Sequence, residues 1–191
     1  RVPFIVRAPG RPKPIRVERL VGLVDVAPTL AGLLGLPPLA GTDGVDLSPL
    51  VRGAAVKAPP RALLCESLTP TRYGANPLHG LVGERWKFIR TTRSELYDLT
   101  RDPAESDDLA AREPAIVAEQ QLLLAERLGA AAAPADHGAA PPVDSETARR
   151  LAALGYAPSP LDADDHLDPA AADPKDLIAV HGAHTRALQL I

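Results

Sequence analysis

The side chains that could do metal chemistry are few and scattered along the chain. The five histidines are His79, His137, His166, His181 and His184. His181 and His184 stand three positions apart, so they would share one face of a helix. Two imidazoles without a neighbouring carboxylate are weak evidence for zinc. We therefore interpret this pair as part of a solvated helix face.

An acidic stretch near the C-terminal end supplies oxygen ligands of the kind that Ca²⁺ accepts. It contains Asp162, Asp164, Asp165 and Asp168. The stretch lacks the glycine and the terminal glutamate of an EF-hand loop. A solvated acidic linker is the interpretation that we prefer.

The only cysteine, Cys65, excludes an internal disulfide and a cysteine-based zinc site. It precedes Glu66, whose negative charge disfavours the thiolate, so a nucleophilic role is not indicated. We expect a buried core cysteine. The sequence also contains neither a Gly-x-Ser-x-Gly nucleophile elbow nor a glycine-rich phosphate loop.

Composition and charge limit the class of protein further. The 191 residues suffice for one domain or one domain with an appendage, and 21 prolines exclude one continuous helical bundle. No apolar run reaches the roughly 18 residues of a membrane span. The chain contains no methionine and opens inside an apolar run, so we expect that its N-terminal part is missing.

Charge is distributed unevenly between the two halves of the chain. Residues 1–100 hold 14 Lys and Arg against 8 Asp and Glu, whereas residues 101–191 hold 7 against 16. The two halves are therefore expected to meet different surroundings. The basic side chains are scattered without interleaved aromatic residues, which argues against nucleic-acid binding.

The elements expected in the first 60 residues suit the end of an α/β domain. A continuous apolar run at 2–6 predicts a strand buried on both faces, as in a parallel sheet, and a second weak strand pattern covers 17–24. A helix is predicted from 26 to 34, with the carboxylate of Asp25 as its N-cap and Gly35 as its end. A single helical turn is expected at 47–51.

The elements that follow predict a small antiparallel sheet with a covering helix. Strand patterns cover residues 61–67, 78–83, 85–91 and 94–99. A stripe with a 3.6-residue period predicts a helix at about 114–128, ending at Gly129, that covers the sheet.

The chain beyond that helix predicts a mobile, partly helical tail. Residues 129–143 form an Ala/Pro/Gly linker. A short helix at 145–154, capped by Ser145, and a mobile segment at 157–173 follow. A last amphipathic helical segment starts at Asp173–Pro174. The expected domains are therefore 1–60, 61–128, 129–173 and 174–191, and the fold class is α/β in the first and α+β in the second.

Five sequence segments, in order, resemble the type I sulfatases of the alkaline phosphatase superfamily. They are RVPFIVRAPG (1–10), VDVAPTL (24–30), DGVDLSPL (43–50), WKFI (86–89) and ELYDLTRDPAE (95–105), which DLA (108–110) continues. The resemblance implies that residues 1–60 end the α/β domain of such an enzyme and that 61–128 are its C-terminal subdomain. The segment RRLAALGY (149–156) resembles bacterial sulfatases that carry tetratricopeptide repeats, which implies a helical, protein-binding region after residue 174.

The same resemblance implies the chemistry of the whole enzyme. A formylglycine, made from Cys or Ser in a C/S-x-P/A-S-R motif, attacks the sulfur of a small-molecule or glycan sulfate ester, and a Ca²⁺ ion orients it. Neither group is expected to be bound by this chain. Cys65 is followed by Glu66, Ser67 and Leu68 and so does not match the motif.

What this chain is expected to add is contact with the leaving group of the substrate. The segment TRYGANPLH (71–79) lies between two predicted strands, and Arg72, Asn76 and His79 are its candidates for substrate binding. Two alternatives stay open. One is a phosphodiesterase or phosphonate hydrolase of the same superfamily, and the other is a non-catalytic scaffold with a protein-binding tail.

Overall fold

The computed structural model describes residues 4–7, 14, 16–54, 60–131, 144, 146–147, 149–150 and 167–188. The chain divides into two compact units, Arg1–Leu63 and Leu64–Ile191. Each unit is described by itself. The predicted domain boundaries at 60, 128 and 173 stay predictions.

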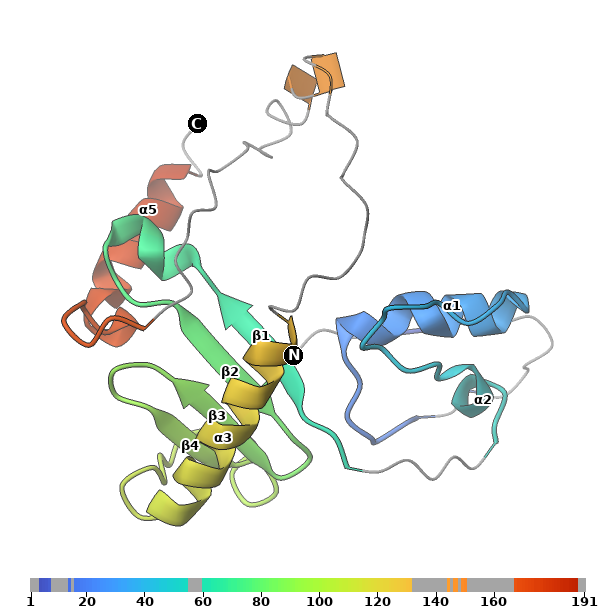
Figure 1. Cartoon of the computed structure of the whole chain (residues 1–191), viewed down its shortest axis with the longest axis horizontal. Helices are drawn as coiled ribbons and strands as arrows, with labels where there is room; N and C mark the ends of the chain where they lie inside the picture. Colours follow the sequence, from blue (N-terminus) through green and yellow to red (C-terminus); the bar gives the residue numbers. More distant parts are fainter. Residues whose placement is uncertain are drawn as a thin grey trace. The chain divides into compact units, whose positions relative to one another are not determined.

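The first unit is built around two short helices. A 3-10 turn, η1 (Leu23–Asp25), leads into α1 (Val26–Leu34), which contacts α2 (Ser48–Val51) (Figure 1). Gly35 ends α1 with φ of 69°, a left-handed conformation that glycine adopts without steric cost. The helix predicted at 26–34 is therefore confirmed with its predicted end.

Two strand predictions in this unit are wrong. Phe4–Arg7 and the segment 17–22 form no strand, and the side chain of Ile5 is 89% exposed. A buried parallel strand needs hydrogen-bonded neighbours on both sides. In the described part of the unit no strand lies next to Phe4–Arg7 to provide them.

The second unit contains the predicted antiparallel sheet. Its strands are β1 (Leu63–Ser67), β2 (Leu78–Val82), β3 (Trp86–Arg90) and β4 (Glu95–Asp98), in the order β1-β2-β3-β4. Antiparallel pairing places Leu81 opposite Phe88, and Phe88 opposite Leu96. Since these three side chains are fully buried, they form the centre of the core.

The predicted covering helix is also present. Helix α3 (Pro114–Ala131) lies across the sheet and contacts β2 and β3 (Figure 1). Leu124 is its fully buried side chain, whereas Leu122 on the other side is 74% exposed. Gly129 does not end the helix as predicted, because α3 continues to Ala131.

The last described elements are η3 (Pro174–Leu177) and α5 (Ile178–Leu188), as predicted from the Asp173–Pro174 signal. The side chain of Asp173 accepts the amide of Lys175 and caps η3 at 3.0 Å. Only residues 146–147 and 149–150 of the helix predicted at 145–154 are described, and they are helical. The linker 132–143 and the segment 151–166, with His137, His166, Asp162, Asp164 and Asp165, lie outside the described residues.

No helix in the described ranges is both long and apolar enough to cross a membrane.

Candidate functional site

The loop between β1 and β2 carries two of the predicted substrate-binding residues, and β2 carries the third. It begins with a 3-10 helix, η2 (Thr69–Tyr73), that ends at Gly74 with φ of 78°. Arg72 lies on η2 with an exposed side chain. Asn76 and His79 are buried, Asn76 being 2% exposed. In this conformation Arg72 is therefore the one of the three that is open to a ligand.

Asn76 binds a segment that lies far along the chain. Its Oδ1 accepts the amide of Asp168 at 2.8 Å, and its Nδ2 donates to the Asp168 carbonyl at 2.8 Å. The Asn76 amide donates to the carbonyl of Ala172 at 3.1 Å, and Ala75 forms a parallel bridge with Ala172. Both the side chain and the backbone amide of Asn76 thus bind residues 168–172.

His79 lies inside the sheet, opposite Arg90 of β3. Its Nδ1 is 3.1 Å from Nη2 of Arg90. Because Arg90 donates, Nδ1 is the accepting nitrogen in this contact. The geometry makes His79 part of the packing between β2 and β3.

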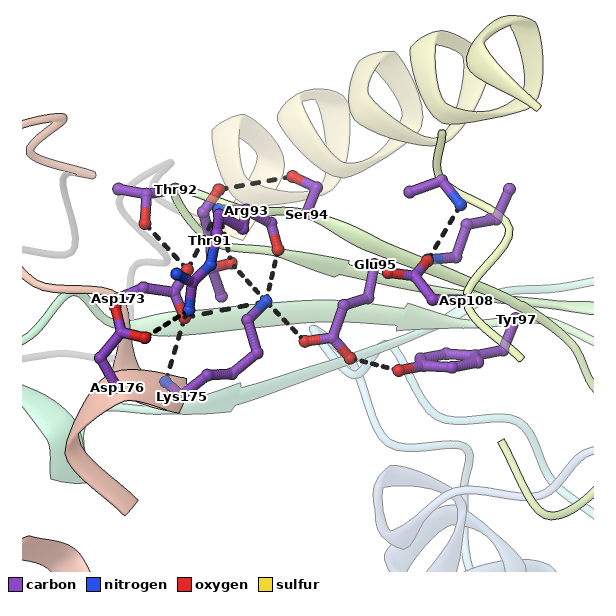
Figure 2. A network of polar contacts seen from close by, with 12 residues as sticks. Thr91, Thr92, Arg93, Ser94, Glu95, Tyr97, Asp108, Asp173, Lys175 and Asp176 are labelled. Atoms are coloured by element: carbon purple, nitrogen blue, oxygen red, sulfur yellow. Dashed lines mark hydrogen bonds and ion pairs between the residues drawn. The ribbon is translucent and has the colours of Figure 1, made fainter. Parts of the chain in front are cut away.

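Residues 167–177, called the strap below, bind Asn76 at one end. At the other end they bind the turn between β3 and β4, which Figure 2 shows. Asp173 is almost fully buried there. Its Oδ2 accepts the Thr92 hydroxyl at 2.8 Å and the Arg93 amide at 3.0 Å. Residues 167–173, which the sequence predicted to be mobile, are therefore tied to the sheet and its loop by hydrogen bonds.

Lys175 of the strap is bonded to the same turn. Its Nζ donates to Oε1 of Glu95 at 2.7 Å and to the carbonyl of Arg93 at 2.5 Å. Arg93 in turn donates to Asp176 at 2.7 Å. Figure 2 shows Lys175 reaching between Arg93 and Glu95, so opposite charges alternate across the contact.

The electrostatics of this contact favour an ionised Asp173. Burial by itself would raise the pKa of the carboxyl group, but the hydrogen bonds from Lys175, Thr92, Thr91 and Arg93 lower it to about 2. The pKa of the neighbouring Tyr97 is raised instead. Burial and its hydrogen bond to Glu95 raise the pKa of the phenol.

The carboxylates of the ELYDLTRDPAE segment have structural partners. Asp98 accepts the hydroxyl of Thr100 at 2.6 Å and Nε of Arg85 at 3.0 Å, which lowers its pKa to about 2. Asp102 accepts the amides of residues 106 and 107 at 2.6 and 2.8 Å. These acidic side chains therefore shape the chain between β4 and α3.

Asp25 of the VDVAPTL segment has a similar role in the first unit. It is fully buried, and its Oδ1 accepts Nη2 of Arg61 and the amide of Val45, both at 2.9 Å. Its Oδ2 accepts the amide of Gly22 at 2.8 Å. The predicted N-cap hydrogen bond into α1 is wrong, because the carboxylate points back toward these partners.

The described residues do not fit a metal site or a formylglycine nucleophile. Within the described ranges no three His, Cys, Asp or Glu side chains gather closely enough to hold a metal ion. Cys65 is exposed rather than buried in the core, since β1 is an edge strand of the sheet. Partial burial of its thiol raises its pKa, which disfavours the thiolate further.

The strap and the partners of Asp25 are the features that sequence analysis missed. Arg93 is followed two residues later by Glu95, and Asp173 is followed two residues later by Lys175, so the two segments carry opposite charges in the same order. That pattern was visible in the sequence. Nothing local, however, indicates that segments some 80 residues apart are paired.

Comparison with known proteins identifies the family. Residues 1–131 match the family model described as N-sulphoglucosamine sulphohydrolase, C-terminal. The chain belongs to the type I sulfatase family. The strap and α5 lie beyond the part of this sulfatase chain that the family model covers.

Curated relatives are sulfatases of several specificities. The chain is 32% identical over 132 residues to the Delta 4,5-hexuronate-2-O-sulfatase of Bacteroides thetaiotaomicron, covering 64% of this chain and 27% of that protein. It is 31% identical over 125 residues to arylsulfatase K of Gallus gallus, covering 61% and 23%. The chain thus spans about a quarter of the length of these relatives.

A solved structure supports the fold. The structure of a 2-O GAG sulfatase superposes with a TM-score of 0.50 at 30% identity, over 56% of this chain and 24% of that one. The fold class predicted from the sequence, a mixed helical and antiparallel-sheet portion of an alkaline-phosphatase-like α/β protein, is confirmed.

Proposed function

We propose that this chain is the C-terminal part of a hydrolase that cleaves sulfate esters of sugars. The match of residues 1–131 to the sulfatase C-terminal family carries the proposal. The relatives include a hexuronate 2-O-sulfatase and an N-acetylgalactosamine-6-O-sulfatase, which support a sulfated glycan as substrate. The alternative, a phosphodiesterase or phosphonate hydrolase of the same superfamily, is tested by the experiment described below.

We infer that the nucleophile and the metal ligands are contributed by sequence outside this chain. In sulfatases the formylglycine supplies the attacking oxygen and Ca²⁺ offsets the charge of the sulfate. The described residues hold no cluster of metal ligands, and Cys65 does not stand in the motif from which a formylglycine is made. The part that we assign to this chain is substrate recognition.

Arg72 is the proposed direct contact to the sugar. It is exposed on η2, and its guanidinium offers planar donors that suit a sulfate or carboxylate substituent. Asn76 and His79 are proposed to act indirectly, by holding the segment that carries Arg72, because both are buried and bonded to protein groups. Arg72 would then contact the leaving group directly, whereas Asn76 and His79 would support it through the protein.

The helical region that begins with α5 is proposed to bind a protein partner. The resemblance of residues 149–156 to sulfatases with tetratricopeptide repeats motivates this. Ile178 and Val180 of α5 are 66% and 45% exposed, so apolar side chains are available for a contact.

The test uses the complete protein that contains this chain. Purified protein is assayed on 4-nitrophenyl sulfate, on sulfated uronic-acid and hexosamine disaccharides, and on a phosphodiester. Arg72→Ala should raise KM for the disaccharides about tenfold and change kcat little, because it removes binding that is present throughout the reaction. Arg101→Ala, at an exposed arginine between β4 and α3, is the matched control. Faster turnover of the phosphodiester than of every sulfate ester would overturn the proposal.

A further inference from the structure

The strap is an intramolecular ligand of the loop that carries Arg72. It contacts the loop through Asn76, whose side chain binds the Asp168 backbone in both directions. A side-chain amide that accepts and donates in this way recognises an extended backbone. The parallel bridge between Ala75 and Ala172 adds a strand-like contact next to it.

The second end of the strap is fixed by charge complementarity. On the sheet, Arg93 is followed two residues later by Glu95, and on the strap Asp173 is followed two residues later by Lys175. The acidic group of each pair meets the basic group of the other, with Lys175 2.7 Å from Glu95. Asp173 and Pro174 are both buried at this end of the contact, whereas the side chains of Arg93 and Asp176 are more than half exposed.

The strap comes from a different part of the sequence than the loop that it binds. The match to the family model ends at residue 131, so the sheet and its loop lie within the matched part and the strap lies beyond it. Buried polar groups are costly unless they are hydrogen-bonded. Without the strap, the buried side chain of Asn76 and the hydroxyl of Thr92 would lose the partners described above.

We propose that the strap, residues 167–177, positions the loop 69–79 for substrate recognition, with Asn76 and Asp173 as its positioning residues. This inference rests on the proposed role of Arg72 in binding the sugar. Asn76 stands only four residues after Arg72, and the left-handed Gly74 lies between them. Holding Ala75 and Asn76 therefore limits the directions in which η2 can present the guanidinium. A sequence segment outside the family domain thus tunes the specificity of the enzyme.

The experiment separates the strap from the substrate role by two readouts on the complete protein. Asp173→Ala removes the carboxylate that accepts Thr92 and Arg93, and Thr92→Val removes one donor from the sheet side with little change of shape. Asp107→Ala is the matched control, because it deletes an exposed carboxylate whose ion pair, among the described residues, is with the exposed Arg112 side chain. Asp173→Asn keeps acceptor capacity and should rescue in part.

The first readout is hydrogen exchange of the Asn76 amide, which donates to Ala172. Exchange should rise about tenfold in Asp173→Ala and less in Thr92→Val, with no change in Asp107→Ala. The amides of strand β3, which pairs with both β2 and β4, should stay protected in all variants, which shows that the sheet is folded. Unchanged exchange at Asn76 in both strap variants would overturn the inference.

The second readout is the division of the kinetic effect between KM and kcat. Asp173→Ala should raise KM for a sulfated disaccharide about three- to tenfold and leave kcat within about twofold, with partial recovery in Asp173→Asn. Faster exchange at Asn76 with an unchanged KM would overturn the role in recognition. If the wild-type protein hydrolyses no sulfate ester, the proposed function fails and recognition with it, while the exchange data still decide whether the strap holds the loop.

Discussion

Arg61 and Asp25 form a buried ion pair in which Nη2 lies 2.9 Å from Oδ1 and the carboxylate is fully buried. The pair ties the end of the first unit to the start of α1, 36 residues earlier in the sequence. Burial opposes the ionised carboxylate, but amides of Gly22 and Val45 and the guanidinium together lower its pKa. The ion pair is therefore a structural feature of the segment that resembles the sulfatase pattern.

Removing this carboxylate should destabilise the first unit strongly. Asp25→Ala leaves the largely buried Arg61 side chain and two amides without their acceptor, which is expected to cost about 3–5 kcal/mol. Asp43→Ala, at an exposed position of the same unit, should change stability by less than about 0.5 kcal/mol. Urea unfolding monitored by circular dichroism measures both. Equal losses would show that the pair is not a stabilising contact.

The packing of α3 on the sheet makes a second prediction with a control on the same helix. Leu124→Asp places a charge on the buried side of α3, which contacts β2 and β3, and it should cost on the order of 3 kcal/mol or more. Leu122→Asp, two residues away on the exposed face, should cost less than about 0.5 kcal/mol. Urea midpoints of the two variants decide this, and a loss below about 1 kcal/mol for Leu124→Asp would mean that the helix does not pack there.

The strap should be released by acid. The pKa of Asp173 is lowered from its ordinary value of 3.8 to about 2, so ionised Asp173 stabilises the docked strap. This contribution is complete above about pH 4 and declines as the pH falls from about 4 towards 2. Carbon NMR titration of the carboxyl group measures the pKa directly. Thr92→Val removes one donor to Asp173 and should bring its pKa closer to the ordinary value; an unchanged pKa would contradict the hydrogen bond.

The isolated chain should hydrolyse no sulfate ester. Its described residues hold no metal-binding cluster, and Cys65 does not stand in a C-x-P-S-R motif. An assay of the purified chain with 4-nitrophenyl sulfate and added Ca²⁺ tests this. Turnover above a buffer blank would show that the chain contains a nucleophile that we have not recognised.

The isolated chain should also self-associate through its first unit. Leu23 and Leu34 are both 73% exposed, and Leu30 and Leu36 are exposed next to them in the sequence. Several exposed apolar side chains in one short segment promote association. Leu34→Lys should reduce the self-associated fraction in sedimentation experiments, whereas Leu122→Lys on α3 should not. A monomeric wild-type chain would contradict the prediction.

Local pattern determined most of the secondary structure. Alternating strand residues and the 3.6-residue stripe of α3 depend on the period of each backbone conformation, so they can be recognised within a short window. Gly35 ends α1 for an equally local reason, its left-handed conformation. The ordered segments from VDVAPTL to ELYDLTRDPAE likewise indicated the sulfatase family before any fold was known.

What only the tertiary structure decided are the partners of buried polar groups. Asp25 has the type and position of a helix N-cap, yet its carboxylate turns to Val45 and Arg61, which approach it from 20 and 36 residues away. Asn76 looked like an open substrate contact, yet its amide group binds Asp168, 92 residues later in the chain. A buried donor or acceptor must find a partner wherever folding brings one, and neither its own residue type nor its neighbours in sequence specify which segment that will be.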